Sequence, residues 1–159
     1  MKLSMRFAFL ALVVLLASSC TKESIGTPEI QQAENNRAVE GALLQRVNEY
    51  RSSLGKAPLA FSGVAYDFAN AHTDYMIASG SLSHHDFDSR ASKMAEQTDA
   101  KSVAENVAKG HADAEAAFQN WFGSTAHRST MEGDFSHTAV SVKIAPDGTL
   151  YFTQIFFLK

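Results

Sequence analysis

The sequence predicts an α+β domain, with helices packed on an antiparallel sheet. Apolar residues recur at three- and four-residue steps from Val39 to Trp121, which is helical spacing. From Val140 to Phe157 the period changes to the alternation typical of strands. Helical periods followed by strand periods are typical of α+β proteins. Roughly 120 residues take part, enough for one domain with a real core and too few for two.

Four helices are predicted from this spacing. The first ends at Gly55, which suits a left-handed cap, and the second spans residues 62–79, with a serine to cap its start and a glycine after its end. His72 lies on the apolar stripe of the second helix. A short third helix begins around Asp88 and a fourth around Asp113.

Two strands are predicted near the end of the chain. Residues 140–144 alternate between apolar and polar or small side chains, and residues 150–157 form an aromatic-rich strand. Asp147-Gly148 between them is a hairpin turn signal. These two strands should pair directly.

Bulky and charged side chains in the helices have structural interpretations. Trp121 and Phe122 are predicted to fill the core between a helix and the sheet. Arg51 and Arg90 are expected to tie helix ends or to reach a carboxylate as structural ion pairs.

Residues 1–19 are interpreted as a lipoprotein signal peptide. Lys2 and Arg6 give a basic start, residues 7–17 an apolar run too short to span a bilayer, and two serines precede Cys20. The alternative, an N-terminal core helix, would have eleven apolar residues without a polar face.

The lone cysteine, Cys20, is the expected site of lipid attachment, because it has no partner for an intramolecular disulfide. Residues 20–38 are predicted to be a flexible tether, and residues 39–159 the folded domain. The predicted protein is exported, anchored to a membrane by its N-terminal lipid, facing the periplasm or the cell surface, and monomeric.

The charge balance excludes one class of partner. Removal of residues 1–19 would leave 12 basic and 17 acidic residues, a formal charge of −5. The Lys and Arg residues form no stripe along the sequence, so nucleic-acid binding is not expected.

Most residues with catalytic or ligating chemistry occur in four short segments. These segments are His72, Ser83 to Asp86, Ala104 to Asn106, and Ala126 to Arg128. Spacings this long do not by themselves show that the side chains converge.

The same segments carry a family resemblance, which covers the chain from about residue 40 to the end. The motifs, in order, are Asn48-Glu49-Tyr50-Arg51, Gly55, Pro58-Leu59, Ala69-Asn70-Ala71-His72, Met76, His84, Phe87, Arg90, Glu105-Asn106, Trp121, His127-Arg128, Gly133-Asp134-Phe135, Val140, Gly148, Tyr151, Gln154 and Phe156. Each motif is loose, but their order and gaps resemble the CAP superfamily, the cysteine-rich secretory, antigen-five and pathogenesis-related proteins with their bacterial relatives.

The resemblance implies a three-layer α/β/α sandwich with a central antiparallel sheet and a cleft holding two histidines and two acidic residues. His84 matches the first histidine, Glu105 the glutamate and His127 the second histidine. Ser124 stands where the family has its second acidic residue.

The resemblance also implies a metal site. Zn²⁺ or another divalent cation could be held by His84, Glu105 and His127, because two imidazoles and one carboxylate leave a position open for water. Glu105 is the candidate catalytic base, but Ser124 removes the second acid-base group that hydrolysis would use.

Several assignments stay open at this point. His85 could replace His84, because neighbouring residues of an extended segment point to opposite sides. Glu105 could serve only to fasten its loop beside the sheet. His72 is interpreted as a packing residue, and His111 and His137 as surface or strand-edge residues.

Three functions are therefore compatible with the sequence. The favoured one is a cell-envelope binding module that holds a small hydrophobic molecule, a glycan, a peptide or a protein partner at a His/Glu cleft. The alternative is a divalent-metal-dependent hydrolase with a two-His, one-Glu site. The third is a structural lipoprotein with a vestigial cleft.

Overall fold

The computed structural model describes residues 33–159. The predicted signal peptide, Cys20 and most of the predicted tether lie outside the described residues. Along this part of the chain the elements are α1 (Arg37–Ser53), β1 (Ala60–Phe61), α2 (Gly63–Ser79), α3 (Phe87–Thr98), β2 (Ser102–Lys109), α4 (Ala114–Gly123), α5 (Thr125–Glu132), β3 (His137–Ile144) and β4 (Leu150–Leu158). No helix among the described residues is both long and apolar enough to span a bilayer.

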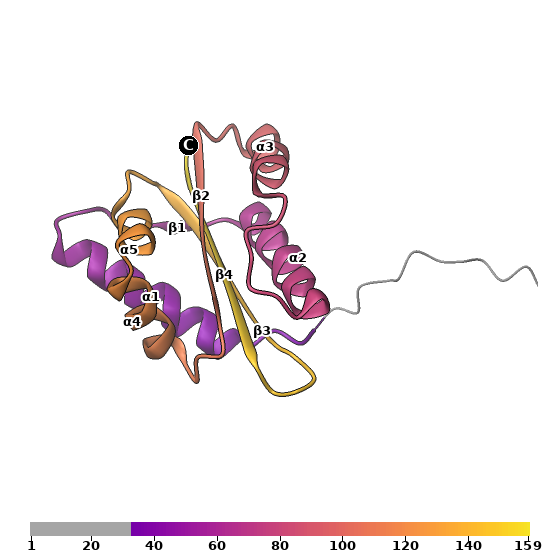
Figure 1. Cartoon of the computed structure of the whole chain (residues 1–159). Helices are drawn as coiled ribbons and strands as arrows, with labels where there is room; N and C mark the ends of the chain where they lie inside the picture. The colour runs from indigo at the N-terminus through magenta and orange to yellow at the C-terminus, as the bar shows by residue number, and fades with distance from the viewer. Residues whose placement is uncertain (1–32) are drawn as a thin grey trace, which may run out of the picture.

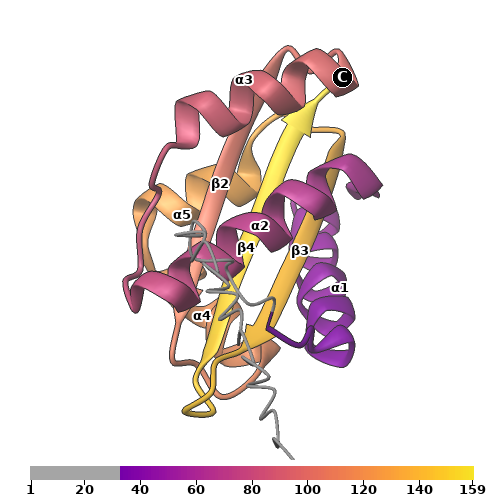
Figure 2. The same ribbon diagram turned by 90° about the vertical axis from the view of Figure 1, so that its right-hand side faces the viewer.

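The elements form three layers, as predicted. The sheet has the order β1-β3-β4-β2, antiparallel except for the two-residue β1, which pairs parallel with β3. Helices α1, α4 and α5 cover one face, and α2 and α3 cover the other (Figure 1). A view turned by 90° shows α2 crossing in front of β3 and β4, with α1 behind the sheet (Figure 2).

Local capping explains where α2 and α4 begin and where α2 ends. Ser62 accepts a hydrogen bond from the backbone N–H of Ala65 at the start of α2, and Gly80 ends it with φ of +64°. Asp113 accepts from the N–H of Ala116 at the start of α4. The predicted bounds of α2 and the predicted start of α4 are confirmed.

The β3–β4 hairpin is also confirmed. Gly148 adopts φ of +84° in the predicted turn, a conformation that glycine takes at little cost. Strand β4 lies between β3 and β2 with helices over both of its faces, so Tyr151 to Phe157 are all buried. This position explains its run of aromatic residues.

The core is divided by the sheet. On the α1 and α4 side, Trp121 is fully buried with Phe152 and Phe156, and its indole N–H donates to the carbonyl of Val107. Phe122 departs from the prediction because it is 38 % exposed, with its ring edge-on to Tyr50. The other side is built from α2 residues and from Met94, Ile155 and Phe157.

Three local predictions need correction. Helix α5 was not predicted, because its Thr, Ser and His residues have low helix propensity. Glu105 lies on β2, a strand where the sequence suggested a loop, so the strands do not all follow the helices. Residues 33–38, placed in the tether, pack on the domain: the N–H of Ala33 donates to Asp74, and Asn36 caps α1.

Arg51 holds helix α5 and the turn after it, although it forms no ion pair within 4 Å among the described residues. Arg51 is 2 % exposed, and its guanidinium donates only to backbone carbonyls. These belong to Ala57, Met131, Gly133 and Phe135, at 3.2, 2.7, 2.8 and 3.1 Å. Burial lowers the pKa of Arg51 despite the opposing effect of Asp134. The arginine therefore satisfies acceptors at the end of a helix, as predicted for one of its two roles.

Candidate functional site

Strand β2 carries the centre of the candidate site at the open edge of the sheet. Glu105 faces the α2 and α3 layer, as do Val103 and Val107, which pack there. Its neighbour Asn106 faces the other layer and donates its side-chain N–H to the carbonyl of His127, 3.0 Å away. Two adjacent residues of an edge strand thus contact both helical layers.

Glu105 is held on both of its oxygens. The guanidinium of Arg90 donates to Oε2 at 2.7 Å and to Oε1 at 3.1 Å, which makes a bidentate ion pair. The Nδ1 atom of His84 lies 2.9 Å from Oε1. The side chain of Glu105 is 1 % exposed. Burial alone would raise the pKa of Glu105, but the hydrogen bonds from His84 and Arg90 and the nearby charges outweigh it and lower that pKa.

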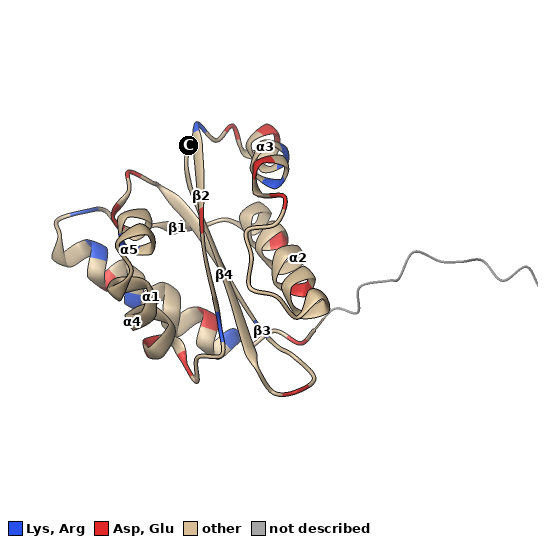
Figure 3. Cartoon of the chain, viewed as in Figure 1, with Lys and Arg blue, Asp and Glu red and all other residues tan. Residues whose placement is uncertain are grey.

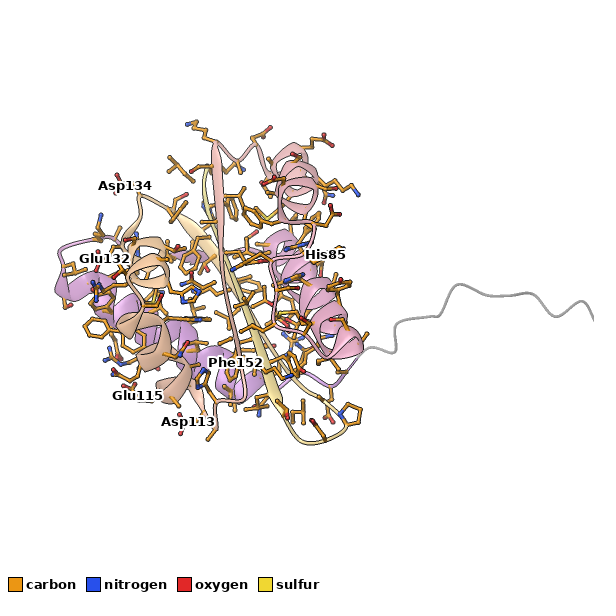
Figure 4. The ribbon with its side chains drawn as sticks, in the orientation of Figure 1. His85, Asp113, Glu115, Glu132, Asp134 and Phe152 are labelled. Atoms are coloured by element: carbon orange, nitrogen blue, oxygen red, sulfur yellow. The ribbon has the colours of Figure 1, made fainter. Side chains whose placement is uncertain are left out.

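His84 contacts the glutamate, and His85 does not take its place. The side chain of His84 is 50 % exposed while its Nδ1 reaches Glu105, so the remainder of the ring faces solvent. The His85 ring instead stacks on Tyr75, with centroids 4.5 Å apart and planes 10° apart. His85 lies on the α2 side of the molecule (Figure 4).

His72 has the packing role that its position on α2 predicts. It is 2 % exposed, and its Nε2 lies 2.7 Å from the carbonyl of Ser83, which requires Nε2 to carry the proton. The same atom is 3.6 Å from Glu105 Oε1. Burial is the main reason that the pKa of His72 is lowered. The histidine fixes the segment that leads into His84.

His127 approaches the site from the opposite layer. It lies on α5, where burial, followed by the charge of His84, lowers its pKa. Asn106, which binds the backbone carbonyl of His127, is the strand neighbour of the Glu105 that His84 contacts, so both histidine residues lie beside the same stretch of β2. Ser124, the residue in place of the second acid, caps α5: its hydroxyl accepts from the N–H of His127 at 3.5 Å. The serine therefore positions a histidine and supplies no acid-base group.

The donor set does not fit Glu105 as a direct metal ligand. Both of its oxygens are engaged by Arg90 and His84. Within residues 33–159 there is no group of three or more His, Cys, Asp and Glu side chains placed to hold a metal ion. The three-ligand site with His84, Glu105 and His127 stays a prediction from the sequence.

Acidification should destabilise the domain through His72. Its folded pKa lies below that of the unfolded chain, about 6.5, so the unfolded state takes up the proton first. The contribution of neutral His72 to the free energy of unfolding is present above pH 6.5 and is lost as the pH falls below that value. We expect urea unfolding between pH 6.5 and 5 to show a pH slope that His72→Gln reduces by up to about 1.4 kcal/mol per pH unit.

The control for this measurement is Met94→Ala, which destabilises a buried site without removing a titrating group. Its stability curve should run parallel to that of the wild type. An unchanged slope in His72→Gln would show that the histidine does not carry this pH dependence.

The family follows from a comparison of the sequence with known families. The model of the cysteine-rich secretory protein family, CAP, matches residues 44–156, well over half of the chain. The chain belongs to the CAP family. No curated protein matches the sequence of this CAP domain.

Solved structures share the CAP fold. An outer surface protein from Borrelia burgdorferi superposes with a TM-score of 0.71 at 14% identity, covering 80% of this chain and 98% of that one. An extracellular protein containing an SCP domain, from Bacillus anthracis, gives 0.66 at 23% identity, with 77% and 41% covered. A cysteine-rich secretory protein from Staphylococcus aureus gives 0.62 at 19% identity, with 82% and 41% covered. Identities this low show the fold alone, and this chain spans about two-fifths of the latter two.

Two residues of the CAP site have contacts that the sequence did not specify. Arg90 was expected in an ion pair, but Glu105 as its partner follows only from the packing of α3 beside β2. Tyr75 carries no signal, because an aromatic residue on a buried helix normally indicates core. It instead lies between His72 and His85, parallel to both rings.

Proposed function

We propose that this CAP domain is an exported binding module that holds a polar ligand, a glycan or a peptide, at the β2 edge between His84 and His127. The observation that carries the proposal is the fixed state of Glu105. Its two oxygens are occupied by Arg90 and His84, and its pKa is lowered. A carboxylate in this state orients an imidazole and does not exchange protons near neutral pH.

The same contacts argue against hydrolysis. A general base needs a pKa near the working pH and a lone pair directed at its substrate. Glu105 offers neither, and Ser124 caps a helix where the family has an acid. Binding requires only that the imidazoles keep their positions, which these contacts provide.

The side chains at the edge favour a polar ligand over a hydrocarbon. The exposed part of His84 and the nearby ring of His127 offer hydrogen-bonding nitrogens. His85, the residue after His84, stacks on Tyr75 of α2, and this pair provides an aromatic surface of the kind that sugar rings and peptide groups pack on. Charged residues of both signs are interspersed over the described elements (Figure 3), without a basic stripe for nucleic acid.

Export and anchoring belong to the same proposal. The signal pattern of residues 1–19 and the position of Cys20 support a lipid-anchored form. Two of the similar structures are described as an outer surface protein and an extracellular protein. A tether from a lipid-modified Cys20 would hold the domain at a membrane surface.

The test is a titration of the imidazole resonances in protein labelled with ¹⁵N-histidine. Chitotriose serves as the glycan probe, tetra-alanine as the peptide probe and dihexanoylphosphatidylcholine, below its micellar concentration, as the lipid probe. We expect saturable shifts of the His84, His85 and His127 rings with the glycan or the peptide, and a loss of affinity of at least about tenfold in His84→Ala, equivalent to about 1.4 kcal/mol.

His111→Ala is the matched control, because His111 lies beyond the C-terminal end of β2, near Phe152, and its loss should leave the affinity unchanged. Saturation by the lipid probe alone would overturn the assignment to a polar ligand. Shifts confined to other residues would place binding away from the β2 edge.

A further inference from the structure

Three buried side-chain atoms, one of them in the His127 ring, have no hydrogen-bond partner among residues 33–159. They are the side-chain oxygens of Asn106 and Gln154 and the Nδ1 atom of His127. Asn106 and Gln154 are paired across β2 and β4, and both are 0 % exposed. Asn106 also binds the carbonyl of His127. The pairing of β2 with β4 and the Asn106–His127 hydrogen bond place the three residues side by side, as one polar cluster between the sheet and α5.

The two amide side chains cannot exchange their oxygen and nitrogen positions. Asn106 lies 3.0 Å from a carbonyl oxygen, which only its N–H can satisfy. The hydroxyl of Thr138 donates its single proton to the carbonyl of Ile155. The Gln154 side-chain atom 3.1 Å from that hydroxyl must therefore be the nitrogen, which donates to it. Two carbonyl-type oxygens are consequently left as acceptors.

Such a cluster needs donors, because an unsatisfied polar group in a protein interior costs free energy, about 1 to 3 kcal/mol for each group. A water molecule supplies two protons, one for each amide oxygen, and its lone pair can accept from His127 Nδ1–H. Buried waters commonly make about three such hydrogen bonds.

We propose that Asn106 and Gln154 hold one buried water that accepts a hydrogen bond from His127 Nδ1–H, so that both residues position His127 and leave its Nε2 unprotonated on the side of the ring away from this cluster. The hydrogen bond at one ring nitrogen sets the state of the other. His127 as a whole is half-buried while its Nδ1 is buried, so the exposed part of the ring is the side away from this cluster.

The Nδ1–H tautomer of His127 indicates which ligands suit the site, an inference that rests on the proposed function. Neutral His84 has the same tautomer, because Glu105 can only accept a hydrogen bond and His84 Nδ1 must therefore donate one. Both rings then offer an Nε2 lone pair. A ligand rich in hydroxyl or N–H donors, such as a sugar or a peptide backbone, complements two such acceptors.

The test is the tautomer of His127, read from long-range ¹H–¹⁵N correlations of the imidazole at pH 7.5 without ligand. We expect a pyrrole-type shift for Nδ1 and a pyridine-type shift for Nε2, the tautomer that free histidine disfavours. In Gln154→Met the pattern should move toward the opposite tautomer. Gln119→Met, on the exposed face of α4, is the matched control and should keep the wild-type pattern.

A second measurement keeps the proposal open to refutation if Gln154→Met fails to fold. Oxygen-17 relaxation dispersion of the wild type should show at least one long-lived internal water. An Nε2–H tautomer in the wild type, or an unchanged tautomer in folded Gln154→Met, would overturn the proposal. Neither measurement uses a ligand, so a failed ligand titration leaves this result standing, and the reverse also holds.

Discussion

Replacement of Arg51 by methionine should lower the free energy of unfolding by at least about 3 kcal/mol, because each of three interior carbonyls that loses its donor costs about 1 to 3 kcal/mol. Methionine keeps much of the apolar stem but leaves the carbonyls of Met131, Gly133 and Phe135 without their donor in the interior. These carbonyls end α5, so the change should loosen the helix that carries His127.

Urea unfolding at pH 7 measures this loss, and hydrogen exchange reports where it is concentrated. Lys56→Met is the matched control, because Lys56 pairs with Asp134 in the same turn but at the surface, where such pairs contribute about 0 to 1 kcal/mol. A small effect of Arg51→Met, comparable with that of the control, would show that water replaces the guanidinium.

Glu105→Gln should cost about 2 to 4 kcal/mol at pH 7, since removal of one partner of a buried ion pair costs up to about 5 kcal/mol and the amide retains one acceptor. The new amide N–H₂ would face the N–H donors of Arg90, which would lie partly buried without a counter-ion. His84 would also lose its charged acceptor. The amide thus tests the charge of Glu105 with little change in shape.

The pH dependence gives this prediction a second, independent readout. The folded pKa of Glu105 lies below that of the unfolded chain, so its stabilising contribution is full above about pH 4.3 and is lost as the pH falls toward the folded pKa. The difference in the free energy of unfolding between the wild type and Glu105→Gln should therefore become smaller below pH 4. Glu49→Gln, an exposed residue of α1, should follow the wild type throughout. A difference that does not narrow on acidification would show that the lost contribution is not that of the carboxylate charge.

The parts of the fold with strong local signals could be predicted from the sequence. Ser62 and Gly80 mark the ends of α2 because a cap depends on neighbouring residues alone. The Asp147-Gly148 turn fixes the β3–β4 hairpin for the same reason. Helix α5 is different, because its residues are poor helix formers and it depends on distant donors such as Arg51.

The candidate site could likewise be predicted only in part. The family resemblance places His84, Glu105 and His127 in one region, but it does not show that Arg90 engages both oxygens of Glu105. That contact depends on how α3 packs beside an edge strand, which no local pattern encodes. Strand β2 itself was missed because a buried glutamate interrupts the apolar alternation of Val103 and Val107.

The open edge of β2 gives any molecule bound there a mechanical role. The sheet separates the two helical layers, with His85 on the α2 side and Glu132 on the α5 side (Figure 4). A ligand that contacts His84 and His127 together would join the two helical layers at the β2 edge, in addition to the hydrogen bonds from Tyr66 of α2 to Glu40 of α1. Its binding would slow the opening of both layers, and amide exchange in α2 and α5 should report occupancy in equal measure.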